Sequence, residues 1–249
     1  MNWLKTLSFA SRHKFNDVHV RIMLRGFDAQ VTDDDLQTDW NERFQALFES
    51  PYLTPFDQQE SMRLLLELQA RFNRFALAVA TVLVQQLSVD RSKWVILPVA
   101  GLGVMGGEKF VVGKVFFKFA RDDKGLFGHN DGLAQKAALN EIRAATALIQ
   151  CRVQHLHTTL TSAIRLHGHC VIATALAPIN NSTLVLGSDN AGRVLHDSSS
   201  VMAEMASRLA AKLNLAKHRL QETEGTHTIV EYHLAGDVEG HSSNKDGRF

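Results

Sequence analysis

The chain has 249 residues, of which 45% are hydrophobic and 21% charged, and its formal net charge is +1. These values are ordinary for a globular protein with a sizeable core, and they exclude a chain drawn to nucleic acid or membranes by overall charge. Only two cysteines occur and they form no CxxC motif, which excludes a disulfide scaffold and predicts a cytoplasmic protein.

The first part of the chain carries a β-prone run and then an acidic segment. Residues 18–24 (VHVRIML) form a short β-prone run before Gly26 and predict a strand. Residues 30–37 include three successive aspartates and are predicted to form a linker that caps the next helix. We therefore expect an N-terminal extension and linker over residues 1–37, followed by one domain over residues 38–249.

Two helices are predicted next. Residues 36–48 carry a single apolar stripe formed by Trp40, Phe44, Leu47 and Phe48. Asp57 is predicted to cap a long helix over residues 58–87, whose stripe consists of Leu65, Leu68, Phe72, Phe75 and Val79. Residues 76–84 are apolar on nearly every side, so this end should be deeply buried. The apolar run is too short to span a membrane, and no membrane insertion is expected.

After Ser88 the pattern changes to that of strands, predicted over residues 94–99 and 110–120. Between them, residues 101–106 (GLGVMG) match the GxGxxG spelling of a dinucleotide-binding loop. That function requires a helix directly after the glycines, whereas β-prone residues follow here. The stretch is interpreted as a hairpin or glycine loop.

The remainder alternates between both types of element. Helices are predicted over 133–150 and 198–213, and strands over 155–164, 170–176, 183–186 and 226–233, before a polar tail over 236–249. The strands at 170–176 and 183–186 flank a Pro- and Asn-rich turn and are expected to form a hairpin that leads into the glycine loop 187–192. Together these elements predict an α+β fold, with a helical N-terminal segment packed on a mixed or antiparallel sheet and further helices.

A strand lysine and a helix glutamate form the first candidate site. Lys118 lies within an apolar strand and Glu141 in the helix that follows, an arrangement with which protein kinases hold ATP phosphates. The HRDxxxxN and DFG motifs that should follow are absent from the sequence, which argues against kinase chemistry. A structural ion pair is the simpler interpretation, and Lys136 with Glu141 is an equally good surface pair.

Histidine and cysteine offer a second candidate. The HxH pairs His155/His157 and His167/His169 each place two imidazoles on one side of a strand, with Cys151 and Cys170 nearby. Because no CxxC or HxxxH knuckle supports these residues, ordinary strand-edge histidines are favoured and no metal is expected.

Several ordered segments resemble one family. The chain resembles the Clu (clustered mitochondria) domain. Residues 38–45 are similar to that family's DWNEELQ opening and residues 115–119 to its IFFSF strand. Residues 167–178 are similar to the family's YRGYRVxAQSxxP pattern, residues 184–194 to its VxYGSxDxGKTV loop, and residues 237–241 with 246–249 to its closing ECKGxxGxDGRxYxLD. The family's Asn-Pro step before the IFFSF strand is absent, and Leu186 replaces the large aromatic residue before Gly187. The chain ends at Phe249, where the family continues into a strand, so we expect a domain without its terminal strand.

The resemblance implies a cytoplasmic, non-catalytic binding or scaffold domain that supports mitochondrial distribution and biogenesis. It also implies messenger RNA or a ribonucleoprotein as a partner, further protein partners, and neither catalytic residues nor a cofactor. The candidate binding residues are Lys118, Lys136, Glu141, Arg165, Gly187, Ser188, Asp189, Gly192 and Arg193. Two alternatives stay open: a degenerate kinase-like or nucleotide-binding domain that uses Lys118 and Glu141, and a domain for protein–protein interaction only.

Overall fold

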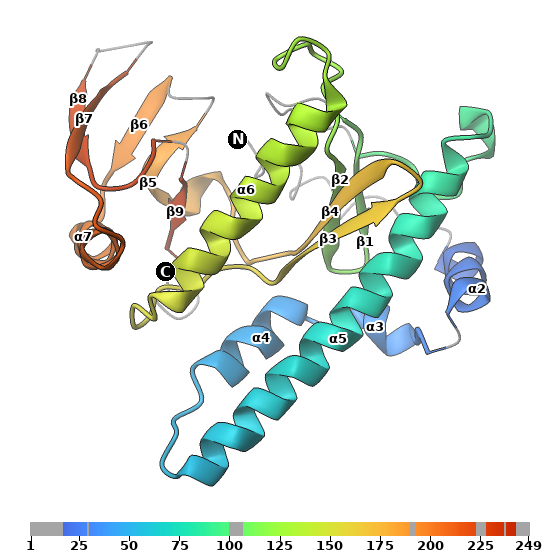
Figure 1. Ribbon diagram of the computed structural model, residues 1–249, viewed down its shortest axis with the longest axis horizontal. Coiled ribbons are helices and arrows are strands. Elements are labelled where there is room, and N and C mark those ends of the chain that lie inside the picture. The colour runs from blue at the N-terminus through green and yellow to red at the C-terminus, as the bar shows by residue number, and fades with distance from the viewer. Residues whose placement is uncertain are drawn as a thin grey trace.

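The computed structural model describes residues 17–28, 30–99, 107–189, 193–222, 228–236 and 238–242. Helices and antiparallel sheets make up this part of the chain, which confirms the α+β prediction (Figure 1). The glycine loop predicted over 101–106 and the candidate residue Gly192 lie outside the described residues.

Three short helices open the described chain: α2 (Asp17–Phe27), α3 (Asp33–Gln37) and α4 (Trp40–Phe48). The predicted strand over residues 18–24 is therefore wrong. Val20 and Leu24 lie one helical turn apart and are both buried in the main core, so packing against α5 overrides the β propensity of the stretch. The predicted linker likewise contains α3, whose Leu36 enters the same core. The domain boundary at residue 38 remains a prediction.

The long helix is α5 (Pro55–Gln86), and it begins earlier than predicted. Its N-cap is Thr54, not Asp57: the Thr54 hydroxyl accepts a hydrogen bond from the Asp57 amide, and the Asp57 carboxylate accepts one from the Thr54 amide. Pro55 fits the first helical position because its missing N–H would be unbonded there in any case. The predicted burial of the C-terminal half is confirmed by Ala76, Ala78, Val79, Ala80, Val82, Leu83 and Val84.

A four-stranded antiparallel sheet lies at the centre, in the order β1-β2-β4-β3. Its strands are β1 (Lys109–Val112), β2 (Val115–Phe119), β3 (Thr161–Leu166) and β4 (His169–Ala175). The helix predicted over 133–150 is confirmed as α6 (Asp131–Gln150). Because side chains alternate along a strand, one face of the sheet packs against α5 and the other against α6 (Figure 1).

Two strand predictions in this region are wrong in detail. The single strand predicted over 110–120 is the β1–β2 hairpin, which turns at Gly113 with a φ of +57°. Residues 94–99 follow the 3-10 turn Arg91–Lys93 and form no strand. The Gln86 side chain bonds both backbone groups of Ile96, at 2.8 and 3.2 Å, and Pro98 has no N–H to give to a sheet.

The C-terminal part builds a second core beside the first (Figure 1). It contains the helix α7 (Ser200–Leu213), the sheet of β5 (Leu184–Asp189), β6 (Val194–Asp197) and β9 (Gly240–His241), and the pair β7 (His218–Gln221) and β8 (Ile229–Tyr232). The helix predicted over 198–213 is confirmed.

The predicted hairpin of residues 170–176 and 183–186 is wrong, because β4 and β5 belong to different sheets. Each pairs instead with its other sequence neighbour, β4 with β3 and β5 with β6. The predicted strands over 155–164 and 226–233 are shorter than expected, as β3 and β8, and the tail predicted as polar supplies β9.

Candidate functional site

The structure brings Lys118 and Glu141 together. Lys118 alternates with the core residues Phe117 and Phe119, so its side chain lies on the α6 face of the sheet. Its Nζ lies 2.9 Å from Oε2 of Glu141 on α6. Only 6% of the Lys118 side chain is exposed, against 47% for Glu141. The ammonium is thus held inside the fold by a carboxylate at its surface.

Lys109 is a residue of this site that the sequence prediction missed. In the β1–β2 register it stands directly opposite Lys118, and it is 9% exposed. Burial lowers the pKa of Lys109, and the charges of Lys124 and Lys118 lower it further. No ion pair joins Lys109 to a carboxylate in the described part of the chain. The sequence could have predicted this pairing. A two-residue turn at Gly113 and Lys114 places residues at equal distances on either side of it opposite each other, and Lys109 and Lys118 are such a pair.

Lys136 and Arg165 are exposed near the same layer. Glu141 forms its ion pair with Lys118 rather than the proposed pair with Lys136, which projects from α6 into solvent. Arg165 lies on the edge strand β3 opposite Cys170. Burial raises the pKa of the Cys170 thiol, and the neighbouring Arg165 lessens that rise. These residues place positive charge along one edge of the α6 layer.

Residues 187–189 of the predicted glycine loop form the end of β5, which lies in a different sheet from Lys118. Gly187 has a φ of +96°, and a Cβ there would lie 2.0 Å from the backbone oxygen of Val238. Ser188 is buried and its hydroxyl donates to the Gly236 carbonyl at 2.6 Å. The backbone of Asp189 ends β5, and Arg193 is exposed just before β6. The geometry around Gly187 and Ser188 is that of a tightly packed strand.

Tyr232 of β8 contacts the backbone of β5 and β6 through its hydroxyl. Its hydroxyl lies 2.5 Å from the His196 carbonyl oxygen and 3.3 Å from that of Gly187. Burial raises the pKa of Tyr232 to about 12. The neutral phenol of Tyr232 therefore links β8 to the backbone of β5 and β6.

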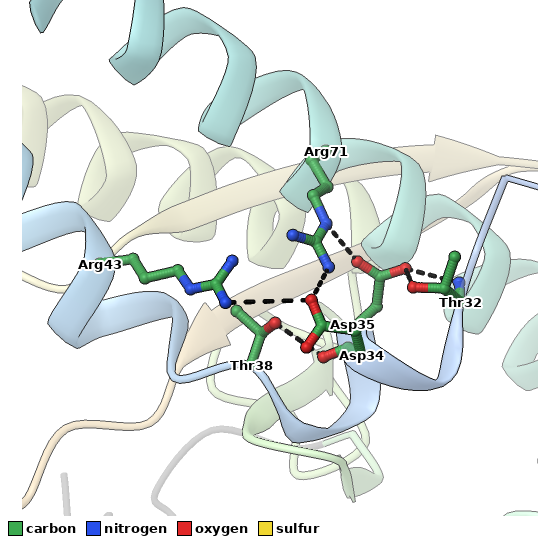
Figure 2. Close-up of polar contacts among 6 residues, drawn as sticks. All are labelled: Thr32, Asp34, Asp35, Thr38, Arg43 and Arg71. Carbon is green, nitrogen blue, oxygen red and sulfur yellow. Dashed lines mark hydrogen bonds and ion pairs between the residues drawn. The ribbon is translucent and has the colours of Figure 1, made fainter.

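A charged network joins the N-terminal helices to α5 (Figure 2). Arg71 of α5 reaches two carboxylates of α3, with Nε 2.6 Å from Oδ1 of Asp35 and Nη2 2.6 Å from Oδ2 of Asp34. Asp35 also accepts hydrogen bonds from Thr32, at 2.6 Å from its amide and 3.0 Å from its hydroxyl. The hydrogen bond from Arg71 is the main cause that lowers the pKa of Asp34. Asp34 and Asp35, which lie in the predicted linker, are thus anchored to the fold.

The histidine and cysteine candidates do not converge. Among the residues that the structure describes, no group of three or more His, Cys, Asp or Glu side chains is placed to hold a metal ion. His157 instead contacts Gln45 of α4 through Nδ1 at 2.8 Å and Glu49 through Nε2 at 3.1 Å. His169 packs edge-on against Phe119, with ring centroids 5.8 Å apart. None of the described helices is both long and apolar enough to cross a membrane.

Comparison with known proteins identifies the relationship of the chain. No curated protein and no solved structure matches it. The model of the family described as clustered mitochondria (CLU) matches residues 39–249, which include the helices α4 and α5, the Lys118–Glu141 pair and the strand β5 that carries Gly187. The chain belongs to the clustered mitochondria (CLU) family.

Proposed function

We propose that the chain is a non-catalytic binding module of a cytoplasmic protein that supports mitochondrial distribution and biogenesis, and that it acts as a scaffold which binds messenger RNA. Membership of the clustered mitochondria family supports the link to mitochondria. The observation that carries the RNA-binding part is the exposed pair of cations on α6 and β3, Lys136 and Arg165.

These two cations lie on connected elements. Gln135, which precedes Lys136, donates from Nε2 to the Gly168 carbonyl in the β3–β4 turn at 3.2 Å, and this contact holds the first half of α6 beside the hairpin that carries Arg165. Within the described ranges, no ion pair joins Lys136 or Arg165 to a carboxylate. Both are therefore available to the phosphates of a single strand, which dominate the affinity of RNA-binding surfaces.

The test is the salt dependence of RNA binding. We expect a labelled single-stranded RNA to bind with an affinity that falls steeply as KCl is raised, because each phosphate contact releases a condensed cation. The double variant Lys136→Met/Arg165→Met should bind more weakly, with a slope of log K against log salt shallower by about 1.4, at ~0.7 for each lost contact. Lys93→Met removes an exposed charge elsewhere and serves as the control. Salt-insensitive binding, or none, overturns the proposal, and a pull-down that survives nuclease indicates a protein-interaction domain instead.

The Lys118–Glu141 pair favours a second candidate function, a nucleotide-binding domain. A strand lysine held 2.9 Å from a helix glutamate is how kinases orient the ammonium toward ATP phosphates. A rise in melting temperature with ATP and magnesium, absent in Lys118→Ala, would favour this candidate. An unchanged melting temperature at saturating ATP would exclude it.

A further inference from the structure

Two lysines face each other across the β1–β2 hairpin, with a third close by. Lys109 and Lys118 are register partners, and both side chains lie on the face of the sheet that α6 covers. Lys124, in the loop before α6, is near enough for its charge to act on Lys109. Like charges directly opposite each other in a sheet destabilise it. This arrangement therefore lowers the stability of the sheet unless an anion offsets each charge.

The nearby carboxylates are engaged with other cations. Glu141 lies against Lys118, and Glu108, next to Lys109 in sequence, pairs with Arg91 at 3.3 Å. Lys109 is nine-tenths buried, and no described carboxylate pairs with it. Lysines are almost never buried in this way without a partner, because an unpaired charge in the interior is expensive. Among the described residues, Lys109 therefore has no anion to balance its charge.

We propose that Lys109, Lys118 and Lys124 form a binding site for a phosphate group. Lysine ammonium groups bind phosphate as point charges with several donors each, and a phosphate dianion at this site would supply the anion that Lys109 lacks among the described residues. Inorganic phosphate and the terminal phosphate of a nucleotide share this chemistry. The proposal is independent of RNA binding, because Lys109 is buried whereas Lys136 and Arg165 are exposed.

Calorimetry and thermal unfolding test the site, with inorganic phosphate, ADP and ATP titrated separately at an ionic strength held constant with KCl. We expect saturable heat and a saturable rise in melting temperature with at least one of the three. Lys109→Met should weaken binding at least tenfold, and Lys124→Met, which changes an exposed loop residue, severalfold. Lys93→Met removes the same charge outside both proposed sites and should bind like the wild type.

Comparison of the three ligands distinguishes inorganic phosphate from a nucleotide as the source of the phosphate group. Equal affinity for phosphate and nucleotides shows that the phosphate group alone is recognised, and tighter binding of ADP or ATP identifies a nucleotide. Without ligand, Lys109→Met should melt at the same or a higher temperature, since it removes an unpaired ammonium. Absence of saturable binding to all three ligands, or full binding in both lysine variants, overturns the proposal. Failure of RNA binding leaves the phosphate proposal intact, because the two proposed sites share no residue. If RNA does bind, Lys109→Met should show the same salt slope as the wild type.

Discussion

Nε of Arg71 on α5 lies 2.6 Å from Oδ1 of Asp35 on α3, and only 3% of the Asp35 side chain is exposed. The guanidinium carbon of Arg71 also lies 5.4 Å from the ring centre of Trp40, at the start of α4. One side chain of α5 therefore contacts both α3 and α4. Trp40 itself packs against Phe72 and Phe75 of α5, so the network and the main core share a boundary.

Replacing Arg71 by methionine should destabilise the fold. The change leaves the buried Asp35 carboxylate without its cation, and removal of one partner of such a pair costs about 3 kcal/mol of the free energy of unfolding. Urea unfolding measures the loss. Arg63→Met is the matched control, since Arg63 pairs with Glu60 and Glu67 on the solvent side of the same helix and should matter far less. Equal losses in the two variants would show that Asp35 does not depend on Arg71.

The pair of Lys118 and Glu141 predicts a compensating double variant. Glu141→Gln leaves a buried ammonium beside a neutral amide and should lower the free energy of unfolding by about 2 kcal/mol. Adding Lys118→Met should restore most of that stability, because an apolar side chain of similar volume fits the layer between Ala120 and Ile172. Urea unfolding of the two single variants and the double variant gives the coupling. Additive losses would mean that the two side chains act independently.

Local patterns in the sequence predicted helices better than they predicted strand pairing. The α6 and α7 helices follow from the spacing of small and apolar residues along a single segment. The strand predicted over residues 18–24 was wrong because it rested on the β propensity of residues such as Val20 and Ile22. Val20 and Leu24 lie one helical turn apart, and packing against α5 favours the helix. That contact cannot be predicted from the sequence of residues 18–24 alone.

The partner of a strand is decided far away in the chain. Residues 170–176 and 183–186 are close in sequence, yet β4 takes its second partner from β2 and β5 takes its own from β9. The Lys118–Glu141 pair could be predicted because it needs only one strand and the helix after it. Lys109 was missed because its place opposite Lys118 depends on where the hairpin turns.

Stability at alkaline pH should reflect Tyr232. Burial raises its pKa to about 12 in the folded chain, above the ordinary value near 10, so the folded state holds the phenol proton more tightly than the unfolded state. This contribution is complete below pH ~10 and is lost as the pH rises from about 10 to 12. Urea unfolding across that range should show a steeper fall for the wild type than for Tyr232→Phe. Parallel curves would indicate that the hydroxyl is not buried.

An ultraviolet titration checks the same group directly. The chain has two tyrosines, so Tyr52→Phe leaves Tyr232 as the only phenol. Its ionisation should occur above the ordinary value in the folded chain and return toward about 10 in urea. An ordinary midpoint in the folded chain would contradict the burial of the Tyr232 hydroxyl.

Gly187 and Gly168 separate the effect of backbone strain from that of a steric clash. Both have a positive φ, +96° and +80°, which disfavours any side chain. A Cβ at Gly168 meets nothing within 4 Å, whereas at Gly187 it lies 2.0 Å from the Val238 carbonyl oxygen. Gly168→Ala should therefore cost about 1 kcal/mol of the free energy of unfolding, and Gly187→Ala clearly more, because β5 must separate from the segment before β9. Similar melting temperatures for the two variants would mean that this contact is loose, and Gly187 would then be a candidate for binding rather than for packing.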